Sequence, residues 1–356
     1  MLKDLKLCPL AIGSLPHNDS EKAMSVVTKD FSEIPFFPQL ANVNRKEDMI
    51  FQVLEGMPAF SSKNISEFSI DSESEEFYND LEEFFSDYEE ILENPMSEKL
   101  DKYGISNEFS STFDKFLKFI EKEKPLYAKA QIVGPFTLSS SLTDKNGVSV
   151  LFDETLRDIV VKLLSLKAVW IIRQIKSANS GTTPIIFTDE PTISQMGTSA
   201  YMTISESDVC EMLSQVSGII QKSGGLSGIH CCGKCDWSIP INAGYNIINP
   251  DGYSYAQHFS LYSDNINKFL NNGGKIVWGI VPTLDDEVLK KITVEDLVKI
   301  FETSVNYLTK KGINEKLITD NSLISSSCGA GSLTEELSQR AMDLIKEVSD
   351  TLRERF

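Results

Sequence analysis

The chain has 356 residues, 41% of them hydrophobic, and a net charge of −18, which is the composition of a globular protein with a sizeable core. No basic cluster offsets the acidic balance, so we expect no nucleic-acid partner. No apolar run reaches the ~20 residues of a membrane span, and the N-terminus lacks a signal-peptide pattern. We therefore expect a cytoplasmic protein without a membrane partner, in which the six cysteines stay reduced.

Short apolar or β-branched runs recur along the chain, and most of them precede a helical pattern. They lie at 9–13, 34–40, 127–134, 184–188, 226–230, 245–249, 275–281 and 322–327. Runs of this length are typical of parallel strands that are covered on both faces. The sequence thus predicts an α/β protein, a single (β/α)8 TIM barrel over residues 1–356. An open doubly wound sheet is the alternative, but its glycine-rich phosphate loop is missing.

One stretch, at about 62–124, departs from this alternation. Its core, "DSESEEFYNDLEEFFSDYEEILENP", is acidic and places aromatic residues at helical spacing, which predicts an amphipathic helix with a solvated acidic face. We interpret the stretch as a helical acidic insertion that could serve as a lid or an oligomer contact. At the other end of the chain, Ser332 and Glu335 form a capping-box pattern ahead of a long C-terminal helix.

Unusual short motifs follow the predicted strands. In chain order they read "GSLPH", "GPFT", "DEP", "HCCG", "PDGY", "VPT" and "SCG". Glycine and proline at a strand end can be simple turn signals. However, the carboxyl ends of barrel strands meet at one mouth, where (β/α)8 enzymes keep their active sites. Acid, thiol and imidazole groups gathered there point to chemistry.

Three of these residues have the pattern of a zinc site. His230 and Cys232 are two apart on a predicted strand, so their side chains face the same side, and Cys328 follows the last strand. One nitrogen and two sulfurs are ligands that select zinc, and three ligands leave a fourth position open for catalysis. A redox pair of Cys232 and Cys235 and buried inert cysteines are the competing interpretations. A disulfide is the weakest, given the expected reducing compartment.

Taken together, "IGSLPH", "GPFTL", "DEP", "HCCG", "WGIVPT" and "SCGAGSL" resemble the superfamily of uroporphyrinogen decarboxylase and cobalamin-independent methionine synthase. The resemblance is closest to the methionine-synthase-like and corrinoid-dependent thiol methyltransferases. It implies a (β/α)8 barrel whose zinc ion is held by His230, Cys232 and Cys328. A further acidic ligand in that family has its nearest counterpart in Asp251, which departs from the pattern in spacing and residue type, and a simple turn is the alternative there.

The resemblance also implies a thiol substrate, with homocysteine as the first choice. Backbone groups of one turn would hold its carboxylate, and carboxylates would hold its ammonium. The matching positions are Ile12, Gly13 and Ser14 for the turn, and Glu55 and Asp189 for the carboxylates, with His17 beside the same mouth. An ordinary turn is the structural alternative for Gly13–Ser14, and a helix N-cap is the alternative for Asp189 or Glu190.

The expected methyl donor follows from a departure from methionine synthase. That enzyme supplies a histidine after its seventh strand to protonate the departing folate, but Val281 lies at or near this position and no histidine occurs from Phe259 onward. A methylated corrinoid needs no such acid, so we expect methylcobalamin or a corrinoid protein as donor, with the acidic insertion as a candidate contact. The alternatives are methyl transfer to coenzyme M or another thiol, a uroporphyrinogen-decarboxylase-like enzyme, and a non-catalytic metal sensor.

Overall fold

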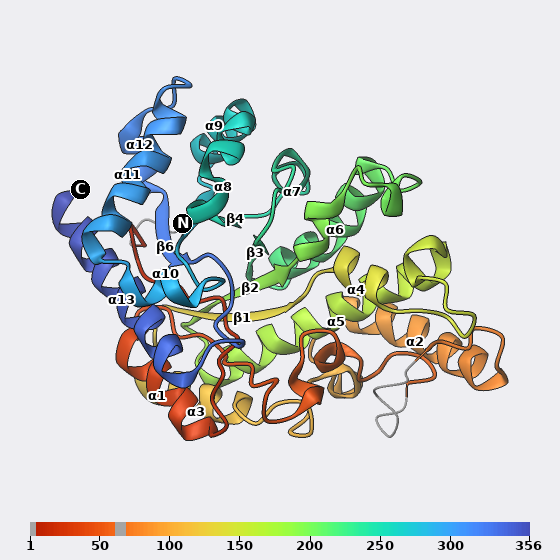
Figure 1. Cartoon of the computed structure of the whole chain (residues 1–356). Helices are drawn as coiled ribbons and strands as arrows, with labels where there is room; N and C mark the ends of the chain where they lie inside the picture. Colours follow the sequence, from red (N-terminus) through yellow and green to blue (C-terminus); the bar gives the residue numbers. More distant parts are fainter. Residues whose placement is uncertain (1–4, 61–68) are drawn as a thin grey trace.

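A curled sheet of six parallel strands forms the centre of the protein (Figure 1). The structure is a computed structural model and describes residues 5–60 and 69–356. The strands follow one another in chain order around the sheet, each parallel to the next. They are β1 (Tyr127–Val133), β2 (Thr183–Asp189), β3 (Leu226–Cys231), β4 (Ile247–Pro250), β5 (Lys275–Val281) and β6 (Ser322–Ser326).

Side chains alternate between two apolar clusters along these strands, as the pleat of a strand requires. On one side, Ile185, Phe187, Ile247, Val277 and Leu323 meet in a single small cluster. Residues from four different strands can converge in this way only on the concave side of the curled sheet. The intervening residues, such as Ile186, Ile229 and Trp278, belong to the large cluster shared with the helices on the convex side.

Helices cover the convex side of the sheet (Figure 1). The longer ones between strands begin at side-chain caps: Asp153 for α5 (Glu154–Ala178), Ser205 for α6 (Glu206–Lys222) and Thr293 for α11 (Val294–Thr309). The others are α1 (Ser20–Asp30), α2 (Glu75–Glu93), α3 (Phe113–Glu123), α4 (Pro135–Ser141), α7 (Ser238–Asn242), α8 (Gly252–Phe259), α9 (Ser263–Asn271), α10 (Asp286–Lys291), α12 (Glu315–Asp320) and α13 (Glu335–Arg355). Within the described residues, no helix has both the length and the apolar character needed to cross a bilayer.

The closed eight-stranded barrel is the part of the expected fold that the structure does not show. Six of the predicted strands are present, but the runs at 9–13 and 34–40 form only isolated bridges. Pro9 bridges to Ile324, Ser14 to Gln39, and Phe36 to Lys129, all in parallel orientation. Several prolines lie in and beside these runs (Pro9, Pro16, Pro35 and Pro38), and because proline lacks an N–H, it cannot donate to a continuous ladder.

The acidic stretch is largely helical where it is described, while its residues 62–68 lie outside the described part of the chain. It contains α2, a short 3-10 helix at Glu98–Tyr103 and α3. Phe113 at the start of α3 stacks on Trp170 of α5, with ring centroids 5.1 Å apart. At the C-terminus, the predicted cap of α13 is wrong by two residues, because Thr334 rather than Ser332 accepts the hydrogen bond from the Leu337 N–H.

Gly13 ends the first N-terminal run, accepts the Gln39 N–H of the second, and lies against Gln131 of β1, so a substitution here tests this packing. Its φ is +140°, and a Cβ added there would lie 2.0 Å from Gln131 Nε2. We expect Gly13→Ala to lower the free energy of unfolding in urea by about 2–4 kcal/mol, from backbone strain and overpacking together. The matched control is Gly147→Ala, where φ is +78° but no atom lies within 4 Å; strain alone should cost about 1–2 kcal/mol. Equal losses would contradict the tight packing at Gly13.

Candidate metal centre

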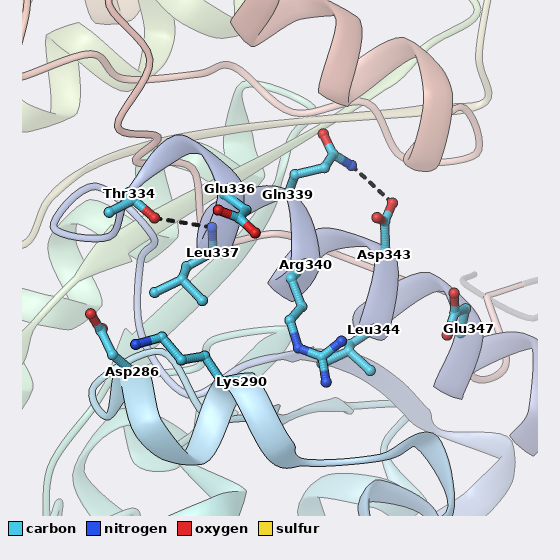
Figure 2. A pocket seen from close by; sticks show the side chains of 10 residues that line it. All are labelled: Asp286, Lys290, Thr334, Glu336, Leu337, Gln339, Arg340, Asp343, Leu344 and Glu347. Atoms are coloured by element: carbon cyan, nitrogen blue, oxygen red, sulfur yellow. Dashed lines mark hydrogen bonds between the residues drawn. The ribbon is translucent and has the colours of Figure 1, made fainter.

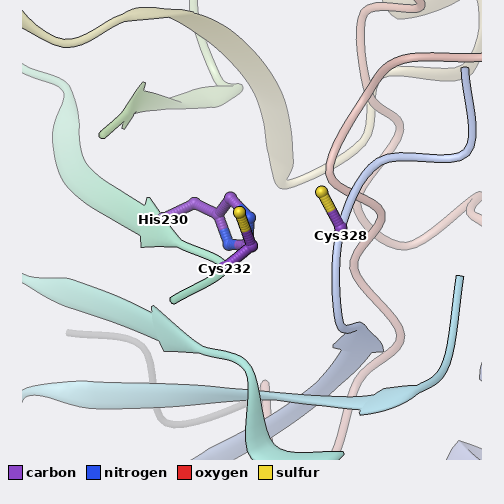
Figure 3. Close-up of side chains that lie close together, drawn as sticks. All are labelled: His230, Cys232 and Cys328. Atoms are coloured by element: carbon purple, nitrogen blue, oxygen red, sulfur yellow. The ribbon is translucent and has the colours of Figure 1, made fainter. Parts of the chain in front are cut away.

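Three potential metal ligands meet at the carboxyl end of the sheet. His230 lies near the end of β3, Cys232 directly follows that strand, and Cys328 lies on the loop after β6. The ligand atoms of these residues all lie within 4.8 Å of one another, and Figure 3 shows Cys328 facing the other two side chains across the mouth. Among the described residues, they form the single such group of three.

The imidazole of His230 is held with one nitrogen available. Its Nδ1 lies 3.2 Å from the backbone oxygen of Asn249 on the neighbouring strand β4. A carbonyl oxygen can only accept a hydrogen bond, so Nδ1 carries a proton, and in the neutral imidazole the lone pair is on Nε2. His230 is only 4% exposed, and Nε2 has no hydrogen-bond partner. Metal-binding histidines are typically oriented in this way by a backbone carbonyl.

The two cysteines share one negative charge. The pKa of Cys232 is lowered to about 4, because the Cys328 and His230 side chains stabilise its thiolate. Correspondingly, the pKa of Cys328 is raised by its hydrogen bond to Cys232 and by burial. Burial alone would lower the pKa of His230, but Cys232 and Asp189 outweigh that effect and raise it. A cation bound at this position would offset the energetic cost of burying these charges.

The donor set and its spacing fit zinc. Bonds of about 2.0–2.3 Å in a tetrahedral site place ligand atoms roughly 3.3–3.8 Å apart. The observed limit of 4.8 Å therefore requires side-chain movements of only about 1 Å. The buried Nε2 of His230, which has no hydrogen-bond partner in the protein, is the observation that points most directly to a metal ligand. His230, Cys232 and Cys328 could hold a metal such as zinc.

Asp189 lies beside this group. It ends β2 in direct register with His230 on β3, and it shares the parity of Ile185 and Phe187, which places it on the concave side. Its side chain is 9% exposed, and Oδ1 has no hydrogen-bond partner. Burial raises the pKa of Asp189, while Lys129 and His230 act in the opposite direction. Thus a carboxylate oxygen is directed at the mouth without a partner in the protein.

Asp251 combines two environments. One carboxylate oxygen accepts the Ser254 N–H at 2.8 Å and caps α8, as the turn interpretation expects. The other oxygen is buried without a partner, and burial raises the pKa of this carboxyl to about 6. The charge of His230 lowers the pKa of Asp251 and that of Cys232 raises it. Asp251 is not one of the three grouped ligands, so its role as a metal ligand remains a prediction.

The turn at Ile12–Ser14 lies next to the loop that carries Cys328. The Ala330 N–H donates to the Ser14 carbonyl oxygen at 3.1 Å. A Cβ added at Gly329 would lie 2.0 Å from Ser14 Oγ, so the two segments are in close contact here. Residues more than 300 positions apart are thereby brought to the same part of the mouth.

The other two predicted substrate residues, His17 and Glu55, each have their own set of neighbours. His17 is buried with Nδ1 unpartnered, and burial lowers its pKa, with Glu335 and Lys22 as charged neighbours. The Glu55 carboxylate accepts the Ser106 N–H at 2.8 Å, and its charge acts on Lys167 of α5. Glu55 therefore has partners in the acidic stretch and in α5.

Sequence reasoning missed two residues that organise the site, and it considered a third, Glu190, only as a helix N-cap. Asn249 supplies the carbonyl that orients His230. Lys129 lies inside the sheet as a fully buried cation. Glu190 accepts hydrogen bonds from the Phe136 and Thr137 N–H groups at 2.9 and 2.8 Å and so caps α4. The "DEP" and "GPFT" motifs were a usable signal, because an acid in one motif caps the helix that begins in the other.

A separate surface cavity lies away from this mouth. It has a volume of about 880 Å³ and lies between α10 and α13, lined mainly by charged side chains (Figure 2). Arg340, in its wall, donates to the carbonyl oxygens of Leu289 and Ile292 and so secures the end of α10. None of the described lining residues has a buried polar atom without a partner. This cavity therefore has no sign of a bound group, unlike the mouth of the sheet.

Comparison of the sequence with protein-family models and with curated proteins gave no match. The site must therefore be interpreted from its own geometry.

Metal binding can be tested one ligand at a time. We expect about one zinc per chain in the purified protein. His230→Ala, Cys232→Ala and Cys328→Ala should each weaken zinc binding by roughly a hundredfold or more, since even second-shell partners contribute 10- to 100-fold. Competition with a chromophoric chelator measures the affinity.

The matched control is Cys231→Ala. Cys231 is adjacent to both ligands but is buried in the convex-side cluster, so this variant should lose some stability and keep its zinc. Zinc loss in Cys231→Ala with retention in Cys232→Ala would contradict the assignment.

Proposed function

We propose that the protein is a zinc-dependent methyltransferase that moves a methyl group from a methylated corrinoid to a small thiol, with homocysteine as the favoured acceptor. The observation that carries this proposal is the group of His230, Cys232 and Cys328 with an unpartnered Nε2, beside the unpartnered carboxylate oxygen of Asp189. Three protein ligands leave one coordination position for a substrate, as in catalytic rather than structural zinc sites.

The chain's own residues would supply the setting for this reaction. Zinc, when bound, deprotonates a coordinating thiol and so provides a thiolate nucleophile at neutral pH. The Asn249 carbonyl keeps His230 in the tautomer that presents Nε2. Two thiolates and a neutral imidazole keep the centre rich in electrons, which suits a sulfur nucleophile better than the hydrolysis favoured by nitrogen and water ligands.

The polar atoms around the mouth favour a thiol that carries an ammonium group. Asp189 Oδ1 and Asp251 Oδ2 are buried acceptors without partners, and Asn249 Oδ1 and Ser325 Oγ, also unpartnered, lie at the same end of the sheet. Buried acceptors of this kind are satisfied by a donor such as an ammonium. A sulfonate such as that of coenzyme M brings further acceptors instead. This difference favours an amino-acid thiol.

The proposed methyl donor follows from whether the leaving group needs a proton. In methyl transfer from a corrinoid, the sulfur lone pair forms the bond to the methyl carbon and the carbon–cobalt bond breaks. Its electron pair stays on cobalt, and the thiol proton goes to solvent, so no general acid is needed at the leaving group. The only described histidines are His17, His230 and His258, and none follows β5. A folate donor would require a proton donor there.

The N-terminal segments support placing this chain with the (β/α)8 methyltransferases. The Leu10 N–H donates to Ile324 of β6, Gln39 to Gly13, and Phe37 to Lys129 of β1. These contacts continue from β6 back to β1 and occupy the places that the first two strands of such a barrel would take. We therefore propose that the chain belongs to this (β/α)8 barrel fold.

The acceptor can be tested at Asp189. Asp189→Asn keeps the size of the side chain and removes its charge, so we expect the Kd of homocysteine to rise roughly 10- to 100-fold, the cost of one charged hydrogen bond. For 4-mercaptobutyrate, which is homocysteine without its amino group, the Kd should change less than threefold. Calorimetric titration of the zinc-loaded protein measures both. Equal losses for the two thiols would remove the basis for an amino-acid acceptor.

The donor can be tested by supplying each candidate. With homocysteine present, the absorbance of methylcobalamin, free or bound to a corrinoid protein, should change as its cobalt–carbon bond is cleaved, and methionine should accumulate. Methyltetrahydrofolate polyglutamate should give no methionine. Turnover with the folate and none with either form of the corrinoid would contradict the proposal.

A further inference from the structure

Thr283, which follows β5, holds the backbone of Cys328. Its Oγ1 accepts the Cys328 N–H at 3.1 Å and donates to the Cys328 carbonyl oxygen at 2.9 Å. Because the single proton of this hydroxyl is directed at that carbonyl, Ser327 Oγ, 3.4 Å away, can only donate to it. The Thr283 N–H in turn donates to Ser327 Oγ at 3.2 Å, and Thr283 is 1% exposed. One buried side chain thus binds both polar backbone groups of a predicted metal ligand.

The end of β5 contains an irregularity in its pairing with β6. Gly279 pairs with Ser325, whereas Val281 pairs with Ser326. Two steps along β5 therefore correspond to one step along β6, which is the pattern of a β-bulge. The backbones are close here, because a Cβ added at Gly279 would lie 2.7 Å from the Ser326 carbonyl oxygen. Bulges beside functional sites commonly redirect a side chain.

The shifted register decides which residue after β5 faces the metal ligand. The Ser327 N–H donates to the Val281 carbonyl oxygen at 2.8 Å, so the shift continues beyond the end of β6. In this register Thr283 comes opposite Cys328. Without the extra residue, Pro282 would take that place, and its side chain has no polar group with which to bind the loop.

Of the three ligands, Cys328 depends most on contacts outside its own strand. His230 lies within β3 and Cys232 directly follows it, whereas Cys328 lies two residues beyond the end of β6 and is followed by Gly329. Zinc sites tolerate deviations of only about 0.2 Å in the distances to their ligands. The position of the Cys328 backbone therefore decides whether the second sulfur can bind.

We propose that Thr283 is a positioning residue for the metal centre: its hydroxyl holds the Cys328 backbone where the thiolate can join the other two ligands, and the bulge in β5 brings Thr283 to that place. This inference rests on the proposed function, in which His230, Cys232 and Cys328 hold a zinc ion. It extends that function to a residue that acts on the centre only through Cys328.

The experiment compares Thr283→Val with Thr283→Ser. Valine has nearly the shape of threonine but lacks the hydroxyl, whereas serine keeps the hydroxyl. In Thr283→Val we expect the zinc affinity, measured by competition with a chromophoric chelator, to fall roughly 10- to 100-fold, as for other outer-shell partners of metal ligands. Thr283→Ser should stay within about threefold of the wild type, because both hydrogen bonds can form.

The matched control is Thr188→Val. It also removes a buried hydroxyl, but the partners of that hydroxyl are Tyr245 Oη at 2.8 Å and the Gly228 carbonyl oxygen at 3.5 Å, and neither residue is a metal ligand. This variant should lower the thermal stability and leave the zinc affinity within about threefold of the wild type.

Cobalt substitution separates positioning from a general loss of stability. The intensity of the thiolate-to-cobalt charge-transfer bands increases with the number of bound thiolates. At saturating cobalt, Thr283→Val should lose about half of this intensity, since one of the two soft sulfur ligands no longer reaches the ion. Thr188→Val and Thr283→Ser should keep the wild-type spectrum.

A double variant tests whether Thr283 acts through Cys328. In the Cys328→Ala background, Thr283→Val should weaken zinc binding by less than about threefold, because the ligand that it positions is already gone. If Thr283→Val alone fails to fold, Thr283→Ala replaces it. The smaller side chain leaves space for water to bind the two backbone groups without fixing their position, so the same loss of zinc affinity is expected.

An unchanged zinc affinity and cobalt spectrum in a folded Thr283→Val or Thr283→Ala, or an equal effect in both backgrounds, would overturn the inference. Metal analysis of the wild type tests the proposed function separately. If the wild-type protein binds no zinc, the zinc-dependent methyltransferase proposal fails, and the role of Thr283 fails with it. If it binds zinc through all three ligands and only the Thr283 comparisons come out otherwise, the inference alone is wrong.

Discussion

The alternation of side chains along a curled parallel sheet is the constraint on which the rest of this structure depends. Every second residue of each strand points to the concave side, and all strands run in one direction, so inward residues at the strand ends must meet. Near the amino ends these positions are apolar, as in Ile185, Ile247 and Leu323. Toward the carboxyl ends they become Asp189, His230 and Asp251. The alternation of side chains thus produces an apolar core near the amino ends of the strands and a polar mouth at their carboxyl ends.

The balance of charge in this mouth follows from its burial. Two cysteine sulfurs, two carboxyl groups and one imidazole lie at the carboxyl end of the sheet, and the charge of the buried Lys129 acts on one of the carboxyl groups, that of Asp189. Burial is the main cause of the raised pKa values of Asp189 and Asp251, and the hydrogen bond between Cys232 and Cys328 lowers the pKa of the first thiol and raises that of the second. A divalent metal and a substrate ammonium are the kinds of cation that would offset the cost of this burial.

Two adjacent acids illustrate how position decides role. Asp189 and Glu190 are neighbours in sequence, yet they point to opposite sides of β2. Asp189 faces the mouth with an unpartnered oxygen, whereas Glu190 is fully buried on the helix side and is satisfied by the first N–H groups of α4. Burial raises the pKa of Glu190 to about 7 despite these bonds. The Asp189 carboxylate is therefore available to a ligand, whereas the Glu190 carboxylate caps α4.

The sequence by itself determined the six regular strands, the helical character of the acidic stretch and the common orientation of His230 and Cys232, whereas Cys328 joined them only through the expected meeting of strand ends at one mouth. Each depends on a short-range pattern: a run of apolar residues, a helical period, or two residues of equal parity at a strand end. Only the tertiary structure decided that the first two runs remain isolated bridges, because this depends on partners supplied by β1 and β6. It also revealed Lys129 and the Asn249 carbonyl, since their importance lies in what faces them across the sheet, and no local pattern encodes a contact between distant strands.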